Sequence, residues 1–114
     1  MMKLRLKDRS LDVRTVECDE GVCLVQCEGE LDIEASPRLR EALEAGVRIA
    51  SRRLVLDLRR VSRIDSSGVG EVVGLCKRLR PGTRLQVLAS NPKVRMLLSM
   101  AGLGGVMSAP GRAA

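Results

Sequence analysis

Short apolar runs alternate with stretches of helical periodicity along this chain, and that alternation restricts the fold more than any other feature. The first two runs cover residues 13–18 and 22–28 and predict a hairpin, because the three residues between them are typical of a turn. The second run is nearly all apolar, so we expect its strand to be buried on both faces. Apolar residues then recur at helical spacing and predict a first helix over about residues 34–50.

The same alternation continues toward the end of the chain. A strand is predicted over residues 54–58, and a second helix covers about residues 69–79, where Pro81 and Gly82 stop it. Another strand covers residues 85–89. A third helix follows and ends at Gly102, with Asn91 as its N-cap and a buried stripe formed by Val94, Leu97, Leu98 and Ala101.

Strands and helices that alternate at this spacing form βα units with short right-handed connections. We therefore predict an α/β fold with a mixed, mostly parallel sheet of four to five strands and helices packed against it. The first strand is expected to join antiparallel at an edge. The domain is expected to cover residues 13–107, between an N-terminal segment over residues 1–12 and a flexible tail over residues 108–114.

Two kinds of residue that the sequence lacks exclude whole classes of function. It has no histidine, which removes the usual general base near neutral pH and the commonest zinc ligand. It also has no Phe, Tyr or Trp, so single-stranded nucleic acid finds no aromatic side chain to stack on, and the core must be aliphatic. We therefore expect no enzymatic activity, no cofactor, no metal site and no direct binding of nucleic acid.

Cysteines, apolar runs and charges give weaker information. Cys23 and Cys27 share strand parity with Val25, so we expect them to pack as small apolar residues rather than to form a disulfide. No apolar run approaches the ~20 residues that span a bilayer, so we expect a cytoplasmic protein without membrane insertion. Residues 48–63 carry six arginines against one acidic residue, and the sequence assigns no contact to this basic cluster.

The segment Ile-Asp-Ser-Ser-Gly-Val-Gly at residues 64–70 is the most informative one, since it leads into the second helix. Asp65 and the two serines after it therefore lie at a helix N-terminus, where capping is typically worth ~1 kcal/mol. A nucleophilic serine is disfavoured, because the segment is not Gly-x-Ser-x-Gly and no histidine can serve as its base. A serine there is also suited to accept phosphate from an external kinase, since a helix N-terminus tolerates a dianion. Capping and phosphorylation both stay open on the residues alone.

Residues 63–70 resemble the D-S-S-G signature of bacterial anti-sigma-factor antagonists, the single-domain members of the STAS family. Gly-Glu-Leu-Asp at residues 29–32 is similar to the G-E-L-D turn of that family, and residues 54–58 are similar to its central strand. Residues 91–94 and 100–103 look like its closing segment. Four matches in the right order over residues 13–107 are far more specific than a lone serine motif, and they imply a STAS-like fold.

The resemblance implies a regulator that switches partners and has no catalytic activity of its own. In the family, the unmodified antagonist binds an anti-sigma factor that is also a serine kinase, and this releases the sigma factor for transcription. The kinase phosphorylates the first serine of D-S-S-G, here Ser66, and a Ser/Thr phosphatase removes the phosphate. The partner-binding residues that the resemblance implies are Gly29, Glu30, Asp32, Asp65, Ser66, Ser67, Gly68 and Val69.

The same fold also serves other tasks, so an alternative stays open. Relatives without a required serine switch act as scaffold subunits of lipid-transport ABC complexes or of stress-signalling assemblies. The intact segment Asp-Ser-Ser-Gly favours the switching antagonist over such a scaffold. For the antagonist we expect a monomer or a weak dimer.

Overall fold

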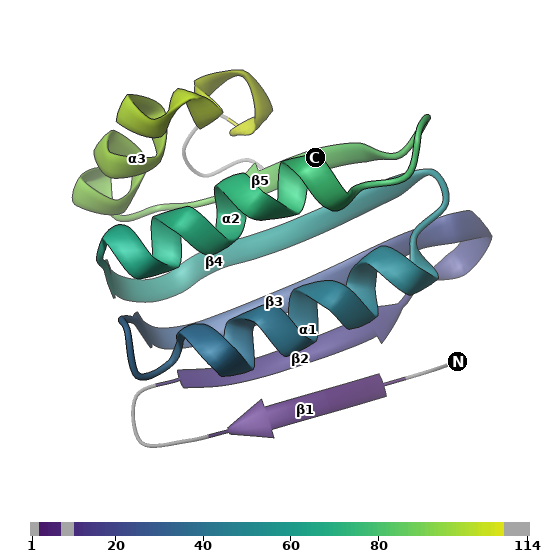
Figure 1. Ribbon diagram of the computed structural model, residues 1–114, viewed down its shortest axis with the longest axis horizontal. Coiled ribbons are helices and arrows are strands. Elements are labelled where there is room, and N and C mark those ends of the chain that lie inside the picture. Colours follow the sequence, from purple (N-terminus) through teal and green to yellow (C-terminus); the bar gives the residue numbers. More distant parts are fainter. Residues whose placement is uncertain (1–2, 8–10, 109–114) are drawn as a thin grey trace.

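The computed structural model describes residues 3–7 and 11–108, which form one five-stranded sheet and three α-helices (Figure 1). The strands follow each other across the sheet in chain order: β1 (Lys3–Lys7), β2 (Leu11–Glu17), β3 (Val22–Leu31), β4 (Arg53–Ile64) and β5 (Arg84–Leu88). The helices are α1 (Ser36–Ile49), α2 (Ser66–Arg78) and α3 (Pro92–Leu98). β1, β2 and β3 pair antiparallel, whereas β3, β4 and β5 pair parallel. The predicted α/β fold with a mixed sheet is confirmed.

The sheet has five strands, within the expected range, but its edge strand is β1 rather than the first predicted strand. β1 lies in the segment that was left outside the domain, and it pairs with β2 along its whole length. β4 continues beyond residue 58 to Ile64, because its parallel pairing with β3 persists up to the pair Leu31 and Ile64. At the other end of the chain, the backbone N–H of Ser108 donates to the Val87 carbonyl at 3.0 Å. The rest of the predicted tail, residues 109–114, lies outside the described residues.

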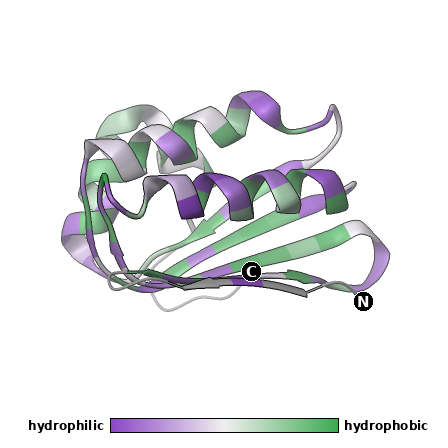
Figure 2. Ribbon diagram, turned by 60° about the horizontal axis from the view of Figure 1, so that its bottom comes forward, coloured by the Kyte–Doolittle hydropathy of each residue, from purple (hydrophilic) through white to green (hydrophobic). Residues whose placement is uncertain are grey.

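Both long helices cover the same face of the sheet (Figure 2). Along β3, Cys23, Val25 and Cys27 point toward the helices and are buried, whereas Leu24 on the other face is half-buried and Gln26 is exposed. The expectation that this strand is buried on both faces was therefore wrong, because within the described residues no helix covers the second face. The packing role expected for Cys23 and Cys27 is confirmed, and burial raises the pKa of the Cys23 thiol to about 11.

The core is aliphatic, as the missing aromatic residues require. Side chains spaced three or four positions apart on each helix meet the inward side chains of the central strands. The largest fully buried side chains include Val13, Val25, Leu39, Leu43, Leu54, Leu56, Leu58, Leu75 and Leu98. Among the described residues no helix is long and apolar enough to cross a membrane.

The third helix begins where the sequence predicted but is shorter. Asn91 is its N-cap, since Asn91 Oδ1 accepts hydrogen bonds from the backbone N–H groups of Lys93 and Val94 at 2.9 and 3.2 Å. After Leu98 the chain enters a wider turn over residues 99–103, and Gly102 takes a positive φ of 89°. Ala101 was predicted to be buried but is exposed, because the chain has left α-helical geometry at that point.

Candidate functional site

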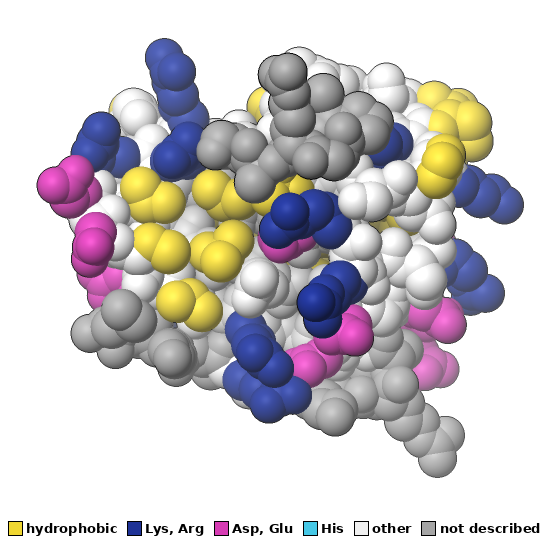
Figure 3. Space-filling model, turned by 180° about the vertical axis from the view of Figure 1, so that it is seen from behind, with side chains coloured by type: hydrophobic (Ala, Val, Ile, Leu, Met, Phe, Trp, Pro, Cys, Tyr) yellow, Lys and Arg dark blue, Asp and Glu magenta, His cyan; other side chains and the backbone are white. Residues whose placement is uncertain are grey.

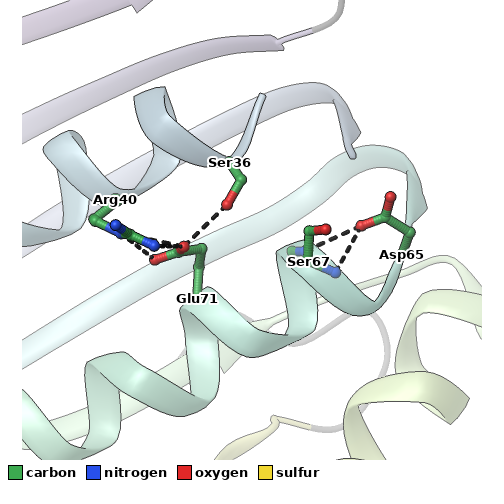
Figure 4. Close-up of polar contacts among 6 residues, drawn as sticks. Ser36, Arg40, Asp65, Ser67 and Glu71 are labelled. Carbon is green, nitrogen blue, oxygen red and sulfur yellow. Dashed lines mark hydrogen bonds and ion pairs between the residues drawn. The ribbon is translucent and has the colours of Figure 1, made fainter. Parts of the chain in front are cut away.

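The start of α2 is held by an aspartate rather than by either of the serines beside it. Asp65 has an extended backbone, and its Oδ1 accepts hydrogen bonds from the backbone N–H groups of Ser67 at 2.9 Å and of Gly68 at 3.2 Å (Figure 4). Ser66 is exposed, and its side chain makes no hydrogen bond within the described part of the chain. Asp65 thus supplies the cap, and the Ser66 hydroxyl stays available at the first position of the helix.

The glycine in this segment is required by close packing. A Cβ atom at Gly68 would lie 2.6 Å from the carbonyl oxygen of Leu31 and 2.8 Å from Cγ1 of Ile64. The same carbonyl accepts the backbone N–H of Asp65 at 3.1 Å, so the first turn of α2 rests directly on the end of β3. This close approach fixes where Ser66 stands relative to the neighbouring loop.

The second group of residues that the sequence singled out lies beside the start of α2: Gly29 and Glu30 belong to the end of β3 rather than to a loop, and only Asp32 lies in the loop that follows. Leu31 pairs with Ile64, which places the ends of β3 and β4 side by side. Asp32 Oδ1 accepts the backbone N–H of Ala35 at 2.9 Å and shapes the turn into α1. Beside it, the side chain of Ile33 is 71% exposed. The structure therefore brings the two groups together at one edge of the sheet.

The eight residues selected from the sequence differ in how far they reach the surface. Asp65 and Ser66 are exposed, and Gly68 is buried under the turn. The other five are half-buried: Gly29, Glu30, Asp32, Ser67 and Val69. The Glu30 carboxylate lies 3.6 Å from the Arg63 guanidinium, which makes a loose ion pair across β3 and β4.

A polar network beneath the site was missed by the sequence analysis. Glu71 is 7% exposed, and its Oε2 accepts the Ser36 hydroxyl at 2.9 Å and Arg40 Nη2 at 2.7 Å (Figure 4). Hydrogen bonds from Arg40 lower the pKa of Glu71, and they outweigh the burial that would raise it. The network joins α1 to α2 one turn after Ser67. A signal was present, since Glu71 falls on the buried stripe of α2, four positions before Leu75.

The sequence analysis also did not predict a groove between the end of β4 and α3, because it assigned only the buried residues of that helix. The groove has a volume of about 260 Å³ and is lined by Ser62, Arg63, Ile64, Lys93, Val94 and Leu97. It lies next to Asp65, since Ile64 is both its wall and the last residue of β4. Two methionines of α3 and of the turn after it, Met96 and Met100, are 51% and 77% exposed.

The surface around Ser66 combines polar, charged and apolar groups. Within residues 3–7 and 11–108 no group of three Cys, Asp or Glu side chains is arranged to hold a metal ion. What the edge presents instead is a free hydroxyl, scattered charges and exposed apolar side chains. Such a mixture of apolar and charged groups is typical of the surface at which a soluble protein binds another.

Comparisons with known proteins agree with this description. The model of the STAS domain family matches residues 14–111. An anti-sigma F factor antagonist of Paenibacillus polymyxa is 34% identical over 94 residues, which cover 81% of this chain and 80% of that protein. A crystal structure of an anti-sigma factor antagonist from Mycobacterium paratuberculosis superposes with a TM-score of 0.80 at 27% identity, over 90% of this chain and 87% of that one.

A third relative has been solved in two states of modification. The antagonist SpoIIAA in its unphosphorylated form matches with a TM-score of 0.72 at 27% identity, over 84% of this chain and 85% of that chain. The phosphorylated form, from Bacillus, matches with a TM-score of 0.67 at 26% identity, over 84% of this chain and 88% of that chain. The family match covers most of the chain and the named relatives share one role, so this protein belongs to the STAS family of anti-sigma-factor antagonists.

Proposed function

We propose that this protein binds an anti-sigma factor through the edge around Ser66 and that phosphorylation of Ser66 ends this binding. The observation that carries the proposal is that Asp65, and not Ser66, caps the helix. Asp65 supplies the helix cap, and the Ser66 hydroxyl is exposed without a structural partner in the described residues. A kinase can therefore reach the hydroxyl, and its modification breaks no hydrogen bond that holds the fold.

A phosphate on Ser66 should leave the domain folded. The group would add a charge of about −1.5 to −2 at pH 7, and the positive end of the helix dipole lies at the same place. Ser66 is exposed, so water solvates the new charge and screens it from the Asp65 carboxylate. We expect the free energy of unfolding to change by less than about 1 kcal/mol, the usual size of surface electrostatic effects.

A bound anti-sigma factor would be far more sensitive to the same phosphate. The exposed Ile33 and the groove beside α3 flank Ser66 with apolar surface that a partner covers on binding. Covering it removes water from Ser66, and burying an unpaired dianion in a contact surface costs several kcal/mol. The modified protein should therefore release its partner while it remains folded.

The proposed partners are an anti-sigma factor, a serine kinase and a Ser/Thr phosphatase. The names of the related antagonists support the anti-sigma factor. A serine kinase, which can be the anti-sigma factor itself, and a Ser/Thr phosphatase are what a reversible switch at Ser66 requires. The description of SpoIIAA in phosphorylated and unphosphorylated forms supports such a switch. We infer a cytoplasmic regulator that acts without catalysis and binds as a monomer or weak dimer.

The test of this proposal is phosphorylation of the purified protein by its anti-sigma factor in the presence of ATP. Peptide mass spectrometry should find one phosphate on Ser66, and none in the variant Ser66→Ala. The variant Ser67→Ala is the matched control, because it removes the adjacent hydroxyl and should still accept the phosphate. Phosphate on Ser67 alone, or on serines elsewhere in the chain, would refute the assignment.

A further inference from the structure

The face of the sheet opposite the helices contains a hollow of about 530 Å³ that is separate from the Ser66 edge. Figure 3 shows this face, with charged side chains gathered beside a group of hydrophobic ones. Strands β2, β3 and β4 form the hollow, and its polar and charged lining consists of Asp12, Arg14, Gln26, Glu28, Asp57, Arg59 and Arg60. None of the residues assigned above to partner binding lines the hollow. Glu28 lines it and is the sequence neighbour of one of them, Gly29.

An irregularity in β4 shapes this hollow. Gln26 of β3 pairs with Asp57, but Glu28 pairs with Arg60, so β4 has one residue more than β3 in this interval. Such a β-bulge redirects side chains, and here the consecutive residues Arg59 and Arg60 both line the hollow. The bulge therefore adds a second guanidinium to a place where regular alternation would supply one.

Asp57 stabilises the bulge through hydrogen bonds with Arg59. Its Oδ1 accepts the backbone N–H and the Nε of Arg59, both at 3.0 Å, and its Oδ2 accepts Arg59 Nη2 at 2.8 Å. Burial would raise the pKa of Asp57, but these bonds outweigh it and lower the pKa, so the carboxylate stays ionised. The charges of Asp57 and Arg59 therefore compensate each other.

The hollow is lined by as many acidic as basic side chains, but Arg5, which lies outside it, adds one further positive charge. Asp12 is held by Arg5 through bonds of 3.0 and 2.8 Å. Glu28 lies 3.9 Å from Arg60, whose side chain is 80% exposed, so this pair is loose and easily separated. Arg14 has no ion pair or hydrogen bond within the described residues. Among the described side chains, the Arg14 guanidinium is therefore unpaired and that of Arg60 is weakly held, beside the Gln26 side chain, which also hydrogen-bonds Asp57.

A second copy of the chain is a poor match for this face. Five strands spaced ~4.8 Å apart, with about eight residues of ~3.3 Å each, give a face of roughly 600 Å². A stable interface buries about 800 Å² on each partner, so stacking two such faces falls short. The hollow itself has a volume within the range of about 300–1,000 Å³ that is typical of sites for small molecules.

We propose that this hollow binds a small organic anion with two acidic groups, carboxylates or phosphates, held by Arg14 and Arg60. The planar guanidinium of Arg14 donates two parallel hydrogen bonds to one acidic group, a geometry that carboxylate and phosphate share. Arg60 leaves Glu28 for the second group, and the Gln26 amide donates to the ligand between them. The site lies on the face away from the helices, so the anion and the anti-sigma factor can be bound together.

The test is a titration of the ¹⁵N-labelled protein with citrate and, separately, with fructose 1,6-bisphosphate at constant ionic strength. Saturable changes in amide chemical shift should appear around the hollow in β2, β3 and β4. Arg14→Gln should weaken binding at least about 10-fold, the size expected for lost hydrogen bonds to a charged group. Arg53→Gln is the matched control, because it removes the same charge from an exposed position outside the hollow.

The outcomes separate this site from non-specific attraction of anions. Binding of citrate alone identifies a carboxylate ligand, and binding of fructose 1,6-bisphosphate alone identifies a phosphate ligand. Saturation with neither compound, or equal weakening in Arg14→Gln and Arg53→Gln, overturns the proposal. Ser66→Ala should bind the anion unchanged, so the site and the proposed switch can fail independently of each other.

Discussion

Gly68→Ala is the substitution that tests the packing beneath the site most sharply, and Gly70→Ala is its matched control. Both glycines lie in α2, two positions apart, and both variants gain the helix propensity of alanine, about 1 kcal/mol. A Cβ at Gly70 meets nothing within 4 Å, whereas a Cβ at Gly68 would lie 2.6 Å from the Leu31 carbonyl oxygen. The difference between the two variants therefore isolates the cost of the close contact.

That cost can be worked out from the neighbours of Gly68. The Leu31 carbonyl cannot move freely, because it accepts the Asp65 N–H, and overpacking of this kind costs about 1–3 kcal/mol. We expect Gly68→Ala to be less stable than Gly70→Ala by about 2–3 kcal/mol. For a domain of this size the thermal midpoints should then differ on the order of 10 °C.

Urea unfolding of the two variants, followed by circular dichroism, measures this difference directly. Gly70→Ala should be as stable as the natural sequence or slightly more stable. Gly68→Ala should be destabilised and should bind the anti-sigma factor more weakly, because the first turn of α2 must shift. Equal stabilities for the two variants would refute the close-packing explanation of this glycine.

Three further predictions concern the surroundings of Ser66. Glu71→Gln should destabilise the protein at neutral pH, because it removes the ionised partner of Arg40. Since folding lowers the pKa of Glu71, the stabilisation by its carboxylate is present above the ordinary pKa of 4.5 and is lost as the pH falls below that value. The unfolding curves of Glu71→Gln and of the natural sequence should therefore converge in acid. Asp65→Ala should cost about 1 kcal/mol of stability through the lost cap, whereas Asp65→Asn should retain most of it; equal losses in urea unfolding would contradict the capping role. Ile33→Glu should weaken binding of the anti-sigma factor in calorimetry at least several-fold without changing the thermal midpoint, and unchanged affinity would remove Ile33 from the contact surface.

Much of the fold could be predicted because hydrophobic periodicity and local chemistry agree. The hairpin, the first two helices and the cap of α3 at Asn91 follow from patterns only a few residues long. β4 was predicted too short because Arg59 and Arg60 interrupt its apolar run, and only pairing with β3 shows that the strand continues. β1 was missed because a short edge strand depends on its partner more than on its own composition.

The candidate site divides in the same way. The position of the two serines at a helix start could be read from the sequence, because capping is local. The close approach of Gly68 to Leu31 and the bonds from Arg40 to Glu71 could not, since their partners lie more than thirty residues away in the chain. The hollow on the open face depends on a bulge in the pairing of β3 with β4, and a bulge of this kind cannot be predicted from a local sequence pattern.

Protein fully phosphorylated on Ser66 offers the most direct test of the central claim. Its affinity for the anti-sigma factor and its thermal midpoint would be measured beside those of the unmodified protein. The account predicts an affinity at least about 100-fold lower, corresponding to ~2.7 kcal/mol, with a midpoint almost unchanged. Undiminished affinity would contradict the switch, and a large fall in the midpoint would show that the Ser66 hydroxyl supports the fold.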